Sequence, residues 1–352
     1  IWNLTRRCNL TCKHCYSHSA NKHYSGELST GEARTVMEDL RAYGVPVLIL
    51  SGGEPLLWPD IHALSRYAKS LGFFVALSSN GTLITEETAD AIAETGYDYV
   101  GVSLDGIGST HDRFRCLDGA FAASIAGIHR CKARGIKAGL RFTMTQDNAH
   151  ELPQLLDLLE AEDLEKFYFS HLNYAGRGNR NRGTDTVHAT TRWAMDLLFE
   201  RCLDGLRSGR MKEFVTGNND ADAAYFLLWL RRRFPEREAD LRVGLTAWGG
   251  NATGIGVANI DTLGNVHPDT FWSHHTMGNV RERPFSAIWS DQSDPVISGL
   301  RRRPRPVGGR CAECRFLPVC NGNTRIRSWQ LTGDLWGEDP GCYLTTEEVH
   351  HV

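Results

Sequence analysis

The sequence contains no apolar run approaching the roughly 20 residues that a membrane-spanning helix requires, so we expect no membrane association. It also lacks an excess of charge: 39 Lys and Arg against 42 Asp and Glu leave a net charge of −3, which argues against bulk attraction to nucleic acid. No internal repeat or low-complexity tract stands out. The sequence starts at Ile1 without a methionine and within an expected strand, so we expect further sequence before it.

Cysteine, in contrast, is present at 10 positions, and its spacing is informative. Seven cysteines form two groups, an N-terminal triad (Cys8, Cys12 and Cys15) and a C-terminal quartet (Cys311, Cys314, Cys320 and Cys342). Closely spaced thiols in a mid-sized, enzyme-like chain indicate metal ligation in a reducing compartment, so we expect a cytoplasmic protein. The remaining three have no spacing partners, and we interpret them as ordinary packing residues: Cys116, Cys131 and Cys202.

The first part of the chain alternates short apolar runs with segments of helical periodicity, the pattern of βα units in a parallel sheet. The expected strands are 1–5, 47–51, 73–78, 99–104, 137–143 and 166–173. The expected helices are one that begins at Ser29 with a capping box to Glu32, then 60–71, 86–94, 121–134 and 152–160. A six-unit partial (β/α)6 barrel of the TIM type and an open doubly wound sheet both fit. In either fold the chemistry lies at the carboxyl ends of the strands.

With 352 residues, the chain is expected to form about two domains. We assign 1–175 to an α/β core and 176–250 to a connecting loop with helices near 192–206 and 221–233. The rest, 251–352, begins with an expected strand at 255–261 and a hairpin partner and then loses regular periodicity. We expect bound metal to replace a hydrophobic core in this last, cysteine-rich domain.

The N-terminal triad follows the first expected strand with the spacing C-x3-C-x2-C and precedes Tyr16. Three thiolates on one loop can hold three irons of a [4Fe–4S] cubane, which usually takes four cysteines. One iron would then keep an open site for a substrate or cofactor. A structural zinc site, completed by His14 or His18, and unligated thiols are the alternatives, although structural zinc prefers paired C-x2-C modules.

This motif resembles the hallmark of the radical S-adenosylmethionine (SAM) superfamily. The resemblance implies that SAM is chelated by the open iron and cleaved by one electron to a 5′-deoxyadenosyl radical, which takes hydrogen from the substrate. Ser51-Gly52-Gly53-Glu54-Pro55 resembles the family's Gly-Gly-Glu motif, which implies that the backbone of Gly52 and Gly53 and the Glu54 carboxylate receive the methionyl ammonium. Tyr16 is likewise implied in cofactor binding.

Further SAM contacts are implied after the third and fourth expected strands. Ser79 and Asn80 in Ser-Asn-Gly-Thr, and Ser103 and Asp105 in Ser-Leu-Asp-Gly, resemble the segments that contact the ribose and methionine of SAM. The stretch His-Asp-x-Phe-Arg that ends at Arg115 is similar to one in the subgroup with C-terminal cluster domains. It implies that Arg115 binds the SAM carboxylate, because guanidinium binds carboxylate bidentately. Cys116 stands where that subgroup often has glycine.

The C-terminal quartet can complete a cubane and leave no iron open, or it can hold zinc. Its spacing resembles the second auxiliary-cluster site of SPASM/Twitch domains, which implies an auxiliary [4Fe–4S] cluster and two clusters in all. Thr324 and Asp269 stand where a full SPASM domain has further cysteines. We therefore expect no other auxiliary cluster.

Two groups of side chains outside these motifs are candidates for substrate binding. Histidine can ligate a haem-type iron and arginine suits carboxylates, which directs attention to His267, His274 and His275 and to Arg177, Arg180 and Arg182. The arginines between 301 and 305 are interpreted as solvated surface charges. Segments 2–8, 320–325 and 332–343 closely resemble the radical SAM enzymes of haem d1 biosynthesis.

That resemblance implies removal of two propionate side chains from 12,18-didecarboxysiroheme, an iron tetrapyrrole. It also implies a low-potential electron donor such as flavodoxin or ferredoxin. Three alternatives stay open: a related tetrapyrrole side-chain-trimming enzyme of the alternative haem pathway, a SPASM/Twitch peptide maturase, and a two-cluster electron carrier. The complete set of SAM-binding motifs argues against the carrier.

Overall fold

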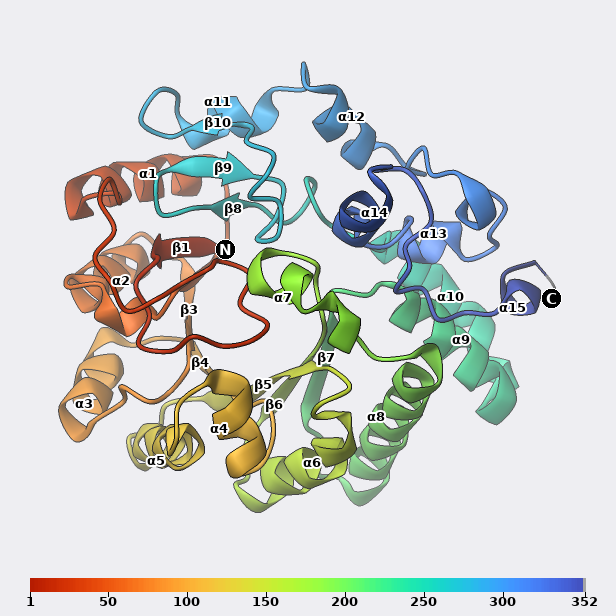
Figure 1. Ribbon diagram of the computed structural model, residues 1–352, viewed down its shortest axis with the longest axis horizontal. Coiled ribbons are helices and arrows are strands. Elements are labelled where there is room, and N and C mark those ends of the chain that lie inside the picture. The colour runs from red at the N-terminus through yellow and green to blue at the C-terminus, as the bar shows by residue number, and fades with distance from the viewer. Residues whose placement is uncertain (351–352) are drawn as a thin grey trace.

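A 10-stranded sheet forms the centre of the computed structural model, which describes residues 1–350. The strands are β1 (Trp2–Thr5), β2 (Val47–Gly52), β3 (Phe74–Ser79), β4 (Tyr99–Ser103), β5 (Ala138–Met144), β6 (Lys166–His171), β7 (Glu213–Gly217), β8 (Asn259–Ile260), β9 (Asn265–His267) and β10 (Gly278–Asn279). Their order in space is β10-β9-β8-β1-β2-β3-β4-β5-β6-β7 (Figure 1). Neighbours from β8 through β7 are parallel, which confirms the expected α/β class.

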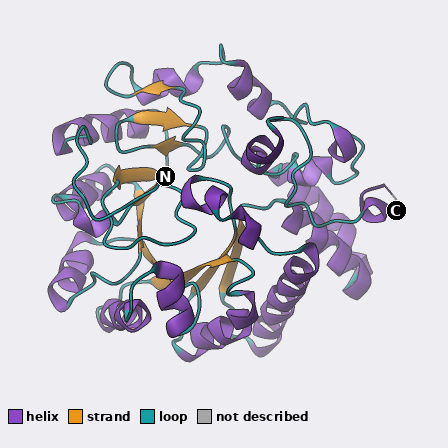
Figure 2. Ribbon diagram, viewed as in Figure 1, coloured by secondary structure: helices purple, strands orange, loops and turns teal. Residues whose placement is uncertain are grey.

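Helices form an outer layer around these strands (Figure 2). Those of the first half are α1 (Thr30–Ala42), α2 (Ile61–Ser70), α3 (Glu86–Thr95), α4 (Ser109–Arg115), α5 (Ala120–Ala133), α6 (Leu152–Ala161), α7 (Gly176–Arg180) and α8 (His188–Ser208). Those of the second half are α9 (Ala221–Arg233), α10 (Pro235–Trp248), α11 (Phe285–Ser290), α12 (Pro295–Arg301), α13 (Leu317–Cys320), α14 (Arg325–Thr332) and α15 (Thr346–His350).

Helix α1 illustrates how the sequence directs this layer. Its capping box is formed as predicted: the Ser29 hydroxyl accepts from the Glu32 backbone N–H, and the Glu32 carboxylate accepts from the Ser29 N–H at 2.8 Å. Val36, Met37 and Leu40 share the buried face and pack in the main core. Burying an apolar side chain of this size stabilises the fold by about 1.5–3 kcal/mol, so such a face fixes the helix against the sheet.

Strand β7 extends the sheet beyond the six strands that the sequence predicts. It lies parallel to β6, so α8 and β7 form one more βα unit in a region that we expected to carry only a loop and helices. Its residues Glu-Phe-Val-Thr-Gly are exposed or half-buried throughout. A short strand at a sheet edge lacks the buried apolar run by which the other strands are recognised.

The hairpin of the last 100 or so residues joins the same sheet. Strand β8 pairs in parallel with β1, with Trp2 opposite Ile260, and β9 and β10 follow as antiparallel neighbours. The expected strand at 255–261 is reduced to β8 at Asn259–Ile260. The backbone before it forms a turn instead, in which the N–H groups of Ile255, Gly256 and Val257 all donate to the Ala252 carbonyl. These hairpin strands lie directly beside β1 in Figure 1.

Two of the single cysteines and one of the later arginines differ from expectation, whereas Arg302 and Arg303 are exposed as predicted. Cys131 is buried as predicted, whereas Cys116 and Cys202 are exposed. Arg305, expected at the surface, is only 2% exposed and donates to the carbonyls of Leu300, Asn323 and Thr253, among others. Because these carbonyls belong to the end of α12 and to two separate loops, the guanidinium ties three segments of the chain together.

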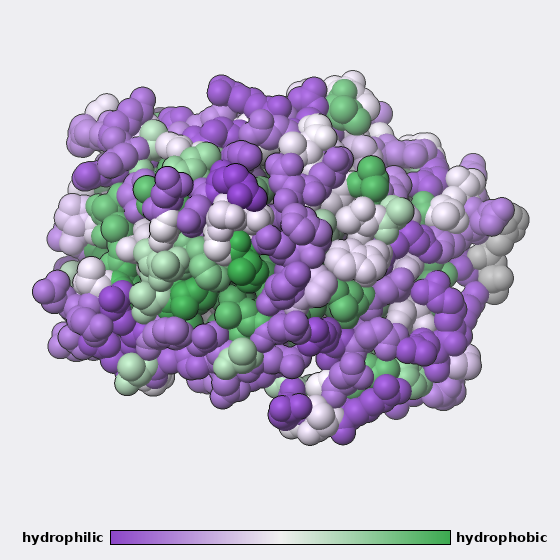
Figure 3. Space-filling view, turned by 60° about the horizontal axis from the view of Figure 1, so that its bottom comes forward, coloured by the Kyte–Doolittle hydropathy of each residue, from purple (hydrophilic) through white to green (hydrophobic). Residues whose placement is uncertain are grey.

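The surface is largely hydrophilic, with apolar residues gathered in one area of the face shown in Figure 3. Among the helices of residues 1–350, none combines the length and apolarity needed to cross a membrane.

Candidate active site and second cysteine site

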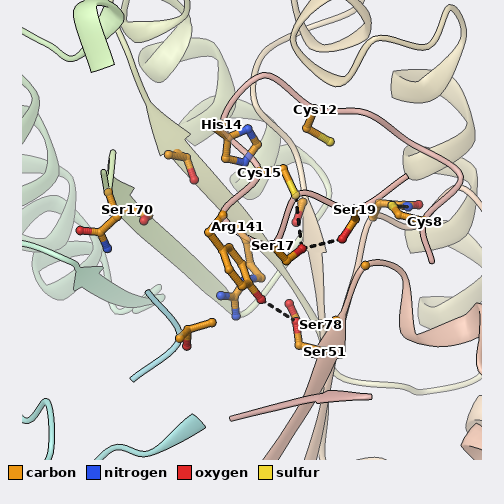
Figure 4. A pocket seen from close by; sticks show the side chains of 18 of the residues that line it. Cys8, Cys12, His14, Cys15, Ser17, Ser19, Ser51, Ser78, Arg141 and Ser170 are labelled. Atoms are coloured by element: carbon orange, nitrogen blue, oxygen red, sulfur yellow. Dashed lines mark hydrogen bonds between the residues drawn. The ribbon is translucent and has the colours of Figure 1, made fainter. Parts of the chain in front are cut away.

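The main cavity of the molecule, of about 250 Å³, lies at the carboxyl ends of β2 to β6. It is lined by the three cysteines of the N-terminal triad and by five other residues predicted for SAM binding: Tyr16, Gly52, Gly53, Ser79 and Asn80. Ser103 and Arg115 line it as well. The structure thus brings together most of the predicted site. In Figure 4 the triad cysteines lie at the top and right, Arg141 lies near the centre below Cys15, and Ser170 lies at the left.

The loop that carries the triad is held from several sides. The Cys8 N–H donates to the carbonyl of Ala20 at 3.1 Å, and the Arg177 guanidinium donates to the carbonyls of Cys12 and Ser19 at 2.7 and 2.9 Å. Arg177 therefore clamps the loop and also lines the cavity. Its side chain is used for a task different from the substrate contact predicted for it.

Burial controls the chemistry of the three thiols. Desolvation raises the pKa of Cys8 to about 12 and also raises the pKa of Cys12, where the charge of Arg115 opposes it. At Cys15 burial also acts to raise the pKa, but the hydrogen bond from Ser17 and the charge of Arg177 outweigh it and lower the value. Buried thiols become ligands when a cation displaces their protons, so this donor set fits a bound iron–sulfur cluster.

Gly52 and Gly53 approach the backbone of the triad loop. A β-carbon at Gly52 would lie 3.1 Å from the Thr5 nitrogen, and one at Gly53 would lie 2.6 Å from the Arg7 carbonyl carbon. The Gly53 N–H also donates to the Thr5 carbonyl at 2.6 Å. Glycine is therefore required here by contact between two loops, in addition to any approach of a ligand.

Glu54 is fully buried and is not among the residues that line the cavity. Its carboxylate accepts hydrogen bonds from the Ser79 hydroxyl and the Asn80 backbone N–H, both at 2.8 Å. Burial raises the pKa of Glu54 to about 7. Without a ligand, the Glu54 carboxylate thus holds the end of β3 in position, and its contact with SAM stays a prediction.

Arg115 and Asp105 are likewise directed at each other. Their side chains form a buried ion pair, and Arg115 Nη1 also donates to the Cys12 sulfur at 3.5 Å. The second oxygen of Asp105 accepts from the Thr143 N–H at 2.9 Å. Asp105 does not line the cavity, so the prediction that it contacts the SAM ribose is not met by this arrangement. The carboxylate that Arg115 binds comes from within the chain.

Several cavity residues were missed by the sequence analysis. They come from β5, β6 and the segments that follow: Arg141, Thr143, Tyr168, His171, Asn173 and Asn218. Arg141 and Thr143 alternate with buried Leu140 and Phe142 along β5, so the period-2 pattern of the strand could have identified them.

The cavity also holds buried polar atoms with no partner among the described residues. These are both amide atoms of Asn173, Nη2 of Arg177, Nε of Arg115 and Nδ1 of His14. Buried polar atoms are normally hydrogen-bonded, so this set fits a polar ligand. Three cysteines beside such atoms fit a cysteine-ligated cluster with a polar cofactor next to it.

Comparison with known proteins agrees with this geometry. Residues 2–159 match the family model described as the radical SAM superfamily. Pre-heme d1 synthase of Dinoroseobacter shibae is 57% identical over 351 residues, which cover 99% of this chain and 87% of that protein. The chain belongs to the radical SAM superfamily. The prediction made from the cysteine motif is thereby confirmed.

Two further proteins are similar to this radical SAM protein, one in sequence and one in fold. Fe-coproporphyrin III synthase of Methanosarcina barkeri is 44% identical over 352 residues, covering 99% of this chain and 88% of that protein. Among solved structures, SuiB of Streptococcus suis bound to S-adenosylmethionine has a TM-score of 0.74 at 18% identity, covering 97% of this chain and 76% of SuiB. At that identity the likeness concerns the fold alone.

The C-terminal quartet of this radical SAM protein lines one small second cavity, between α9, α13 and the loop before α15. Burial raises the pKa of all four thiols, to about 11 for Cys342 and furthest for Cys320. Throughout residues 1–350, no three Cys, His, Asp or Glu side chains converge on a site for one metal ion. The predicted grouping of the four cysteines is nevertheless present.

The three candidate iron-ligating histidines do not line the main cavity. Both ring nitrogens of His267 face oxygens, the His275 carbonyl at 2.8 Å and Asp261 at 3.2 Å. His275 Nε2 lies 2.8 Å from the Asp294 carboxylate. Local carboxylates and carbonyls occupy two of the imidazoles, so this arrangement does not favour an axial ligand from this group, and the axial ligand stays a prediction.

The remaining candidates are also away from the main cavity. His274 is stacked between Trp272 and Trp329, with ring centroids 5.3 and 6.0 Å away. Arg180 and Arg182 are exposed on and after α7. Of the six residues predicted for substrate, Arg177 alone lines the main cavity.

Proposed function

We propose that this protein is a radical SAM enzyme of haem d1 biosynthesis that removes propionate side chains from 12,18-didecarboxysiroheme. The observation that carries the proposal is the 57% identity to pre-heme d1 synthase over nearly the whole chain, combined with a cavity that unites the triad and the predicted SAM-binding residues. The similarity to pre-heme d1 synthase covers 99% of this chain, so it includes the segment of the C-terminal quartet as well as the core.

In this proposal the N-terminal triad holds the catalytic [4Fe–4S] cluster, which supplies the electron for reductive cleavage of SAM. The chain itself orients and shields the reacting groups. Arg177 and the Ala20 carbonyl fix the triad loop, Glu54 fixes the end of β3, and Arg115 donates to the Cys12 sulfur. Among the described residues, the Ser103 hydroxyl has no partner and remains available to SAM, whereas the Tyr16 hydroxyl donates to Asn3 Oδ1 at 3.1 Å and the Asn80 amide is hydrogen-bonded to Asn9 and Thr82.

The C-terminal quartet holds an auxiliary [4Fe–4S] cluster in the same proposal. A low-potential donor such as flavodoxin or ferredoxin supplies electrons, and the enzyme works in the cytoplasm. We retain the division into a core at 1–175, a connection at 176–250 and a Twitch/SPASM-like domain at 251–352.

A second candidate is a related side-chain-trimming reaction on another iron tetrapyrrole. The 44% identity to Fe-coproporphyrin III synthase over an equally long stretch favours it above a peptide maturase. Both candidates share the cavity and the clusters and differ in which side chain reacts.

One experiment separates these functions. The anaerobically reconstituted protein is incubated with dithionite, SAM and 12,18-didecarboxysiroheme, and products are identified by mass spectrometry. Loss of propionate fragments, with 5′-deoxyadenosine, supports the proposal. SAM cleavage with loss of a different side chain would support the other candidate, and absence of SAM cleavage would leave an electron carrier.

A further inference from the structure

The main cavity carries an excess of positive charge. No Asp or Glu of residues 1–350 lines it, whereas Arg115, Arg141 and Arg177 do. Arg115 is neutralised by the ion pair with Asp105 behind the wall, and Arg177 is occupied by carbonyls of the triad loop. Arg141 differs from both, because its guanidinium has no hydrogen bond or ion pair within the described chain.

Arg141 is nevertheless held in a defined place. It lies on β5 opposite Ser103 of β4 and Tyr168 of β6. Its guanidinium carbon lies over the Tyr168 ring, 4.5 Å from the centroid. Its aliphatic stem crosses Gly101, where a β-carbon would come within 2.8 Å of Arg141 Cδ. Glycine on β4 and the tyrosine on β6 thus leave a slot for this side chain.

Tyr168 is itself fixed by the absence of a side chain at Gly217 on β7, where a β-carbon would collide with its phenol. Three strands therefore contribute to the position of one arginine. Arg141 is half-buried, and its fixed guanidinium faces the cavity without a partner among the described residues, so it can exchange water for an anion there. Figure 4 shows Arg141 reaching into the cavity.

The location indicates which anion. The triad and the predicted SAM residues come from β1 to β4 and their loops, whereas Arg141 stands on β5 beside the polar groups of β6. A planar guanidinium lying on an aromatic ring presents its edge for two parallel hydrogen bonds, the geometry that carboxylates accept. Two carboxylates could meet it, that of the tetrapyrrole substrate and that of SAM.

We propose that Arg141 binds a carboxylate of the substrate and so sets which side chain of the macrocycle faces the SAM side of the cavity. This inference rests on the proposed function, since it assumes a tetrapyrrole substrate. Under this inference Arg141 on β5 takes the place of the exposed Arg180 and Arg182 as the carboxylate-binding candidate. Gly101 and Tyr168 then act as positioning residues.

The test uses two probes that differ in charge but hardly in shape, Fe-coproporphyrin III and its tetraamide. Binding of each to the anaerobic reconstituted protein is titrated by the optical spectrum, and SAM binding is measured separately by equilibrium dialysis. The proteins are wild type, Arg141→Gln and the matched control Arg180→Gln, which removes the same charge from an exposed position. Arg141→Lys, which keeps the charge, guards against misfolding of the glutamine variant.

Wild type and Arg180→Gln should prefer the tetraacid. In Arg141→Gln that preference should fall roughly 10- to 100-fold, the worth of a charge-assisted hydrogen-bonded pair; Arg141→Lys should lose less. An unchanged acid preference in Arg141→Gln overturns this inference alone. Weakened SAM binding with the acid preference intact also overturns it and assigns Arg141 to SAM. If wild type binds neither probe, this inference is overturned, whereas the proposed function is decided separately by the products formed from 12,18-didecarboxysiroheme.

Discussion

The buried ion pair between Arg327 and Asp339 should be essential to the C-terminal cysteine site. Both side chains are at most 2% exposed, and Arg327 Nε and Nη2 donate to the two Asp339 oxygens at 2.8 and 2.9 Å. Arg327 Nη1 also donates to the carbonyls of Leu172 and Asn218, which follow β6 and β7. The Asp339 carbonyl accepts from the Cys342 N–H at 3.0 Å. The pair therefore connects the sheet to a cysteine of the quartet.

Replacing Arg327 by Met leaves the Asp339 carboxylate buried without its cation. Breaking a buried pair in this way costs about 3–5 kcal/mol, a large fraction of the roughly 5–15 kcal/mol that keeps a typical domain folded. The double variant Arg327→Met with Asp339→Asn leaves no buried charge, and asparagine can still accept from the Gly341 N–H, which Asp339 Oδ1 now does at 2.8 Å. It should therefore be more stable than the single variant.

The assay is urea unfolding under anaerobic conditions, followed by tryptophan fluorescence, with iron counted on the folded protein. The single variant should unfold at clearly lower urea and lose iron from the C-terminal site. Arg130→Met is the control, because Arg130 pairs with a largely exposed Glu86 and should change the midpoint little. A wild-type midpoint for Arg327→Met, or a double variant less stable than the single one, would refute the reasoning.

Four further outcomes are expected. Replacing the whole N-terminal triad by Ala should leave about half the iron and abolish 5′-deoxyadenosine production; retained SAM cleavage would contradict the assignment. Iron analysis of the reconstituted protein should give about eight irons per chain for two [4Fe–4S] cubanes, whereas zinc in the quartet or twelve irons would exclude a single auxiliary cluster. Alanine at His267, His274 or His275 should leave the optical spectrum of bound tetrapyrrole unchanged, and a shift would restore an axial ligand. Burial raises the pKa of Glu54 from 4.5 to about 7, so folding favours its protonated form, and the stability of the apo protein in urea should fall as pH rises from about 4.5 through 7. The Glu54→Gln variant should lose this pH dependence. If the dependence persists in that variant, another group causes it.

The sequence predicted those features that depend on local pattern. Buried strands are recognised in the sequence by their apolar runs, and the carboxyl ends of parallel strands lie at one edge of the sheet. The sequence therefore predicted that one site unites the triad, Gly52–Gly53, Ser79–Asn80 and Ser103. Strand β7 was missed for the converse reason, since its residues are half-exposed and carry no such run.

Partner choice among charged residues could not be predicted in this way. A sequence shows that Arg305 and Arg327 are charged, and charge ordinarily indicates the surface. Arg305 is buried because its guanidinium finds carbonyls near residue 251 and near residue 323, far apart along the chain. Such contacts depend on how segments distant in the sequence pack against each other, and the strand period of 2 and the helix period of 3.6 residues carry no information about them.

The same limit applies to the family motifs, whose contacts with the cofactor stay predictions. Glu54 and Arg115 each carry a group suited to SAM, yet in the fold each is matched by a group of the chain, the Ser79 hydroxyl and the Asp105 carboxylate. Arg141 belongs to no motif quoted from the sequence; its guanidinium makes no hydrogen bond or ion pair within the described residues, whereas Arg115 and Arg177 each leave one nitrogen without a partner. A residue that the chain does not satisfy is the one with binding capacity to offer a ligand, so unsatisfied groups in a formed cavity identify ligand contacts that motifs alone do not.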